Sequence, residues 1–276
     1  TATLIGDPPN IMIGSAAGLS FADFVMVDAP AAIICLIVMI GLFYLLFGRK
    51  FKVDEEHRRA LMERDEREEI KNPTLLRQSV IMIILVTAGF MLHGSLGIES
   101  CVVALTAAGI LMLISGERIE EALAHVEWTT LVFFAGLFIV VGALSEVGVI
   151  GMLAQALIDV TGGSTFIAML VLLIASAIIS SFLDNIPFVA TMIPILLSME
   201  ATGMDVAPLW WAVSLGACLG GNGTLIGASA NVVMSDISRK NGHVITFAHF
   251  FKVGFPTMLA TVAVSAIYLI VRFPPM

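Results

Sequence analysis

Two similar eight-residue motifs contain several of the polar residues of this chain that could bind a ligand. Residues 3–10 read TLIGDPPN and residues 224–231 read TLIGASAN, so five of the eight positions are identical. A second stretch follows each copy, since residues 20–30 (SFADFVMVDAP) align with residues 246–256 (TFAHFFKVGFP), again with five identities. Paired, interrupted apolar segments in corresponding places of two halves are typical of the binding sites of transporters with internal repeats.

The sequence DPPN at residues 7–10 predicts a break in a helix. Proline fixes φ and has no N–H donor, so a helix cannot continue undisturbed through two of them. The ends of a broken helix present N–H groups to anions and C=O groups to cations. In the second copy Asn231 matches Asn10, and Ser229 stands where the first copy has a proline. The repetition favours a pair of ligand-binding loops over a simple extracellular turn.

Asp184 and Asn185 lie in the middle of an apolar stretch that covers residues 163–200. A carboxylate at membrane depth costs about 2.5 kcal/mol or more unless it is paired or hydrated, so an acid there indicates function. The neighbouring oxygen atoms, among them the hydroxyl of Ser181, suit a hard cation such as Na⁺. Burial would instead make Asp184 a proton carrier. The structural alternative is that Asp184 caps the helix that follows it.

These segments together predict one binding site for a small solute and its coupling ion, with no catalytic residues. Its members supply hydroxyl, carboxylate and amide groups. They are Thr3, Asp7, Asn10, Ser181, Asp184, Asn185, Asn222, Thr224, Ser229 and Asn231. We expect no cofactor, H⁺ or Na⁺ as the coupling ion, and Na⁺ ligands at Asn185, Asn10 and Asn231.

The composition places these residues in a membrane. The chain is 58% hydrophobic and 13% charged, its mean hydropathy is +1.00, and soluble domains carry about 25% charged residues. A net charge of −8 without a basic cluster argues against a nucleic-acid partner. No HExxH or Ser–His pattern supports an enzyme, including an intramembrane hydrolase. We therefore predict an all-α, multi-pass protein of the cell (inner) membrane, with the lipid bilayer and a small solute as its partners.

Apolar runs of about 20 residues predict the helices that position the site. The predicted segments are the end of a first repeat (1–47), a cytoplasmic linker (48–78) and a second inverted repeat (79–276). The linker contains nine of the fourteen Lys and Arg residues, which places it inside by the positive-inside rule. Within the second repeat we expect scaffold spans (79–150), a re-entrant hairpin (163–200), a broken helix (207–238) and a last span (247–272). Two full crossings are the alternative to the hairpin.

Three motifs resemble those of the ArsB/NhaD/P-protein branch of the ion transporter superfamily, which also contains citrate and dicarboxylate permeases. They are TLIGDPPN (3–10), SFLDNIPFVATMIPI (181–195) and LGACLGGNGTLIGASANVV (215–233). The resemblance covers essentially the whole chain and implies an inverted-repeat fold with re-entrant hairpins and broken helices. It also implies a homodimer in which a transport domain moves like an elevator against a scaffold. The N-terminal part of the first repeat, with its hairpin, is then expected before Thr1.

The resemblance implies an ion-coupled secondary active transporter with alternating access. The dicarboxylate carriers of the superfamily have Ser-Asn-Thr at the hairpin tip, whereas this chain has Asp184 and Asn185. A carboxylate in place of a neutral hydroxyl favours proton coupling or a neutral or cationic solute, with Asp184 as the coupling acid. The expected activity is arsenite or anion efflux, or Na⁺/H⁺ exchange. Symport of citrate or a dicarboxylate with a cation is the alternative, and a passive anion channel is a weaker one.

Overall fold

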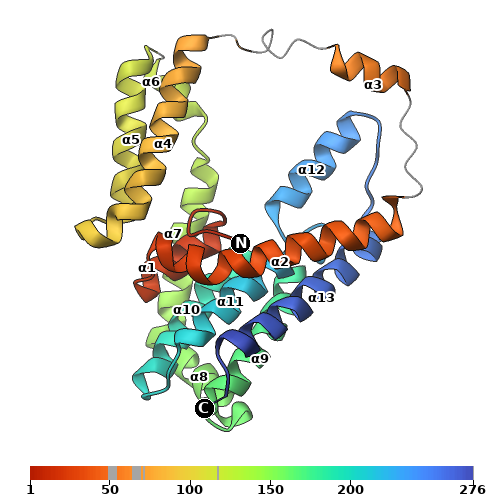
Figure 1. The fold of residues 1–276 in the computed structure, drawn as a ribbon. Helices are drawn as coiled ribbons and strands as arrows, with labels where there is room; N and C mark the ends of the chain where they lie inside the picture. Colours follow the sequence, from red (N-terminus) through yellow and green to blue (C-terminus); the bar gives the residue numbers. More distant parts are fainter. Residues whose placement is uncertain (49–54, 64–69, 71, 117, 276) are drawn as a thin grey trace. The chain divides into compact units, whose positions relative to one another are not determined.

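The computed structural model describes residues 1–48, 55–63, 70, 72–116 and 118–275, and these residues form α-helices and no β-strand (Figure 1). The helices are α1 (Pro8–Ala17), α2 (Phe21–Leu46), α3 (Glu55–Met62), α4 (Pro73–Leu96), α5 (Ser100–Ser115), α6 (Ile119–Ala124), α7 (Trp128–Glu146), α8 (Val149–Thr161), α9 (Thr165–Phe182), α10 (Asn185–Ala201), α11 (Ala207–Gly220), α12 (Ser229–Lys240) and α13 (Phe247–Arg272). Within these residues five helices, α2, α4, α7, α9 and α13, are long and apolar enough to cross a membrane. The prediction of an all-α, multi-pass integral membrane protein is confirmed.

The chain divides into two compact units. One unit consists of Thr1–Met39 and Thr129–Met276, and the other of Ile40–Trp128. In the second unit α4 and α5 pack against each other. The helix α4 starts at Pro73, earlier than the predicted span, because the side chain of Asn72 accepts a hydrogen bond from the amide of Leu75 and proline suits the first helical position.

The first unit contains a helix that the sequence analysis did not anticipate. A span was expected to continue to residue 150, but α7 ends at Glu146 and α8 follows from Val149 to Thr161. Gly148 separates them with a φ of +79°, a left-handed conformation that costs glycine little. The short helix α8 packs against α9 and α10 and supports both of them.

Helix α11 is the buried centre of the first unit and contacts α1, α9, α10 and α13 (Figure 1). Small residues bring it very close to α9. A Cβ atom at Gly216 would lie 2.7 Å from the carbonyl oxygen of Leu173, and one at Gly220 would lie 2.6 Å from that of Ala177. Glycines four residues apart on one face allow this kind of close crossing between membrane helices.

Three of the helix boundaries in this unit lie at the predicted binding-site motifs. The helix α1 begins at Pro8, residues 183–184 separate α9 from α10, and residues 221–228 separate α11 from α12. Prolines, an Asp-Asn pair and clustered glycines mark these places in the sequence. The grouping of the helices into two inverted repeats stays a prediction. So does the linker over 48–78, of which α3 is described and residues 49–54, 64–69 and 71 lie outside the described residues.

Candidate functional site

The two copies of the motif fold in the same way. In the first loop (residues 1–7) the side-chain nitrogen of Asn10 donates to the carbonyl oxygen of Thr3 at 3.0 Å. In the second loop (residues 221–228) Asn231 makes the same bond to Thr224, also at 3.0 Å. Each asparagine makes one further bond to a loop carbonyl, Asn10 to Thr1 at 3.0 Å and Asn231 to Gly221 at 2.8 Å. The two predicted asparagines therefore shape their loops.

The backbone at the start of the following helices is also alike in the two copies. Asp7 precedes α1 with φ −156° and ψ 139°, and Ala228 precedes α12 with φ −151° and ψ 143°. The amides of Gly6 and Gly227 bond to the carbonyls of Thr3 and Thr224 at 3.1 Å and 3.3 Å. Sequence likeness between the copies thus extends to their local structure.

The second loop contacts the end of α9, on one side of the turn between α9 and α10 at residues 183–184, which is the predicted hairpin tip. Ser181 donates its hydroxyl to the carbonyl oxygen of Gly220 at 2.9 Å, and Thr224 donates its hydroxyl to the carbonyl oxygen of Ser181. A Cβ atom at Gly227 would lie 2.9 Å from that same carbonyl of Ser181. Gly227 is therefore needed for close contact with the tip.

The first loop contacts the start of α10, on the other side of the tip. The side-chain nitrogen of Asn185 lies 3.2 Å and 3.4 Å from the two carboxylate oxygens of Asp7. Asp7 makes no capping bond to its own helix, so its carboxylate is directed to Asn185 instead. The hairpin tip consequently lies between the two loops, with α9 bonded to one and α10 to the other.

Asp184 has the capping role that the sequence analysis gave as its structural alternative. Its carboxylate accepts a hydrogen bond from the amide of Ile186 at 3.0 Å, at the start of α10. A role in ion coupling stays a prediction. The side chains of Asn222 and Ser229 are exposed. No hydrogen bond joins either of them to the other predicted site residues in the described part of the chain.

A buried polar cluster that the sequence analysis missed lies beside the first loop. Asp28 of α2 and Ser214 of α11 are both fully buried, and Oγ of Ser214 lies 2.5 Å from Oδ2 of Asp28. The signal was available, because Asp28 is an acid inside a long apolar helix and lies in the repeated stretch at residues 20–30. Its partner is remote in sequence, so the pairing could not be anticipated.

Asn10 connects this cluster to the first loop. Its Oδ1 atom accepts hydrogen bonds from the hydroxyl of Ser214 at 2.8 Å and the thiol of Cys218 at 3.2 Å. With two further bonds from its nitrogen, all four hydrogen-bonding positions of the amide are used. A Na⁺ ligand at Asn10 would therefore require one of these bonds to break. Among the described residues, no three His, Cys, Asp or Glu side chains are grouped to hold a metal ion.

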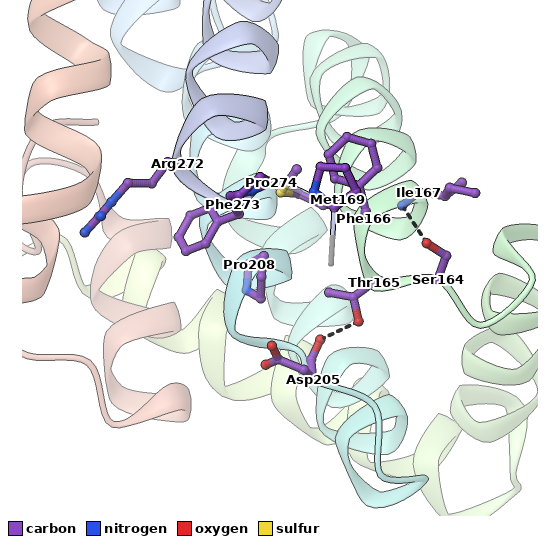
Figure 2. Close-up of a pocket in the computed structure, with 11 residues that line it drawn as sticks. Ser164, Thr165, Phe166, Ile167, Met169, Asp205, Pro208, Arg272, Phe273 and Pro274 are labelled. Carbon is purple, nitrogen blue, oxygen red and sulfur yellow. Dashed lines mark hydrogen bonds between the residues drawn. The ribbon is translucent and has the colours of Figure 1, made fainter.

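A pocket of about 720 Å³ lies between the start of α9, the start of α11 and the end of α13 (Figure 2). Thr165 donates its hydroxyl to the carbonyl oxygen of Asp205 at one side of it, and Arg272 lies at the other (Figure 2). The rest of the lining is largely apolar and includes Phe166, Met169 and Phe273. None of the predicted site residues lines this pocket.

Comparisons with known proteins identify a family of transporters. Residues 1–216 match the family model described as citrate transporter. An uncharacterized transporter of Mycobacterium tuberculosis is 44% identical over 276 residues, which cover 99% of this chain and 64% of the relative. A 46 kDa membrane protein of Mycobacterium leprae is 42% identical with the same coverage, and the P protein of Sus scrofa is 38% identical over 79% of this chain and 27% of its own length. The chain thus spans 64% of the length of these mycobacterial relatives.

Proposed function

We propose that this chain, which belongs to the citrate transporter family, carries out ion-coupled secondary transport of a small solute. The family and the relatives named as transporters place it among transporters and not enzymes. The observation that carries the proposal is the hairpin tip between the two loops at helix breaks, with Asn185 bonded to Asp7 of the first loop and Ser181 bonded to Thr224 of the second. Transporters with internal repeats bind their substrates at such interruptions.

The bond between Asp7 and Asn185 gives this junction a means of responding to a ligand. A cation that binds the carboxylate of Asp7, or a solute that binds the amide of Asn185, competes with the bond between them. A ligand shifts an equilibrium between conformations only through a difference in its affinity for them. Binding at the junction would thus change the stability of the contact between tip and loop. We propose that this change drives alternating access of the elevator type in a homodimer.

Within the superfamily we propose the ArsB/NhaD/P-protein branch, with arsenite or anion efflux or Na⁺/H⁺ exchange as the activity. The similarity to the P protein, at 38% identity, supports this placement. Symport of citrate or a dicarboxylate with a cation is the second candidate, favoured by the match of residues 1–216 to the citrate transporter model. Carboxylates at Asp7 and Asp184 repel a bare anion, so an anionic solute would have to be accompanied by cations.

The proposal is tested with the purified full-length protein in sealed proteoliposomes that contain a pH-sensitive dye. Gradients of Na⁺, citrate, succinate, arsenite and chloride are imposed one at a time, and labelled solute is followed in parallel. We expect one solute to move against its gradient when H⁺ or Na⁺ moves down its own. Flux that only follows the solute gradient would show a channel instead.

Asp184→Asn should abolish coupled uptake in this assay and leave the protein folded. Glu200→Gln is the matched control, because Glu200 is exposed at the other end of α10 and should keep wild-type uptake. Normal coupling in Asp184→Asn would remove Asp184 as the coupling acid.

A further inference from the structure

Asp28 lies in a setting that is unfavourable for an ionised carboxylate. Its side chain is fully buried, and its Oδ1 atom has no hydrogen-bond partner. In the part of the chain that the structure describes, no Lys, Arg or His side chain forms an ion pair with it. An isolated buried charge carries a large desolvation penalty, and an unpaired buried oxygen adds to it. The neutral, protonated acid avoids most of this penalty.

The number of protons at Ser214 leads to the same conclusion. The hydroxyl of Ser214 has one proton, but its oxygen lies within hydrogen-bond distance of Asn10 Oδ1 (2.8 Å) and of Asp28 Oδ2 (2.5 Å). The side-chain amide of Asn10 cannot be flipped to exchange its oxygen and nitrogen, because the nitrogen donates to the carbonyls of Thr1 and Thr3. Ser214 can donate to Asn10 and remain bonded to Asp28 only when Asp28 carries a proton and donates it to Ser214.

We propose that Asp28 is a proton-binding site of the transport cycle, and that its proton fixes the first loop to α11. The inference rests on the proposed function, names H⁺ as its coupling ion and adds Asp28 to Asp184 as a residue that binds it. With the proton bound, hydrogen bonds run from Asp28 to Ser214 and from Ser214 to Asn10. When the proton leaves to water, Ser214 donates to the carboxylate, and the oxygen of Asn10 faces a hydroxyl oxygen that no longer donates to it.

The structural effect of losing this proton would reach the start of α10 through the first loop. Asn10 holds that loop through the carbonyls of Thr1 and Thr3, and Asp7 of the same loop bonds to Asn185 at the start of α10. When Asn10 loses a hydrogen bond, the first loop is held less firmly. Asp7 is then held less firmly opposite Asn185 at the hairpin tip. Proton binding and the contact between loop and tip are then linked, and linkage acts equally in both directions.

Two other titratable side chains lie near Asp28, and both are hydrogen-bonded elsewhere. They are the thiol of Cys218 on α11 and the phenol of Tyr268 on α13. The amino group of Thr1 also lies near enough to interact electrostatically with Asp28, and the carboxylate of Asp7 lies near Cys218. Cys218 donates to Oδ1 of Asn10, and Tyr268 donates to the carbonyl oxygen of Val27 at 2.8 Å. Neither side chain supplies a positive charge to Asp28.

The second copy of the repeated stretch has no corresponding acid. Asp28 aligns with Gly254 of α13, where a Cβ atom would lie 2.7 Å from the carbonyl oxygen of Asn222 in the second loop. At this position α13 contacts the second loop through its backbone, so there is no space for a carboxylate. The proton site therefore belongs to the first copy alone.

Infrared spectroscopy of the full-length protein tests whether Asp28 is protonated. The wild type should show a carboxylic acid C=O band that shifts in heavy water, and Asp28→Asn should lack it. Asp23→Asn is the matched control, since Asp23 lies one turn earlier in α2 and accepts from the amide of Ser20 at 2.7 Å. Ser214→Ala should keep the band at a higher frequency, because the acid loses its partner. Identical bands in the wild type and Asp28→Asn would overturn the inference.

Transport measurements separate this inference from the proposed function. In Asp28→Asn, solute uptake driven by a proton gradient should fall about tenfold or more, as expected for two linked sites. Exchange of labelled for unlabelled solute should continue, because the amide donates to Ser214 as the acid does. If the wild type transports and Asp28→Asn responds normally to protons, the inference fails while the proposed function stands. If the wild type moves no solute, the proposed function fails, and the infrared band still decides whether Asp28 binds a proton.

Discussion

Asn231 illustrates how one side chain can decide the shape of a loop. Its nitrogen donates to the carbonyls of Gly221 and Thr224. In Asn231→Asp both donors are lost while the size of the side chain is kept. The buried carbonyl of Gly221 would lose its donor, which costs about 1–3 kcal/mol, whereas the carbonyl of Thr224 keeps its bond from the amide of Gly227. We expect a lower unfolding temperature for the purified protein in detergent, measured by light scattering or intrinsic fluorescence.

Asn222→Asp is the matched control for this prediction. Asn222 lies in the same loop with its side chain exposed, so the same chemical change should leave the unfolding temperature as in the wild type. An Asn231→Asp protein as stable as the wild type would show that the loop does not depend on these two bonds.

Single residues also show how much of the site could be predicted. Asp7, Asn10 and Asn231 stand in motifs whose local chemistry, proline or glycine next to a polar side chain, predicts a helix break. Their hydrogen-bond partners could not be predicted, because Asn185 and Ser214 lie far from Asp7 and Asn10 in the chain. Folding alone brings such groups together. Asp28 was predictable as an acid in an apolar helix, but its bond to Ser214 was not.

The crossing of α9 and α11 depends on glycine. In Gly220→Ala the new Cβ atom would lie 2.6 Å from the carbonyl oxygen of Ala177, a backbone atom that cannot move aside without shifting a helix. Overpacking of this kind costs about 1–3 kcal/mol. We expect less folded protein after heating, measured by size-exclusion chromatography of a fluorescent fusion.

Gly151→Ala provides the comparison for the crossing. Gly151 lies in α8 with nothing within 4 Å of the new methyl group. Alanine favours a helix by about 1 kcal/mol over glycine, so this variant should be as stable as the wild type or slightly more so. An equal loss of folded protein in Gly220→Ala and Gly151→Ala would show that stability does not depend on the close crossing at Gly220.

The bounds of a helix were predictable where an apolar run or a residue type sets them. They were less predictable where a single backbone angle ends the helix. The last span was expected over 247–272, and α13 covers Phe247–Arg272. The helix α8 was missed because the apolar run continues past Gly148, and only its φ of +79° separates α7 from α8. Sequence periodicity carries no information on such an angle, since glycine is common in membrane helices.

The distribution of charge over the chain predicts which side of the membrane each end of α13 faces. Lys and Arg are concentrated in residues 48–78 and occur again at Arg239, Lys240 and Lys252, whereas Arg272 stands at the far end of α13. Cytoplasmic loops carry the excess of Lys and Arg. A helix of 26 residues is about 39 Å long, at 1.5 Å per residue, and the hydrocarbon core is about 30 Å thick. The two ends of α13 should therefore lie on opposite sides.

Cysteine labelling in intact cells tests this orientation. In a full-length protein in which every cysteine is changed to serine, among them Cys35, Cys101 and Cys218, His243→Cys and Pro275→Cys each place one thiol at an exposed position beside α13. A membrane-impermeant maleimide should label Pro275→Cys in intact cells and His243→Cys only after the membrane is opened, and the cysteine-free parent should stay unlabelled. Labelling of both positions from outside would mean that α13 does not cross. The reverse pattern would place Arg239, Lys240 and Lys252 outside, which would contradict the orientation predicted from the positive-inside rule.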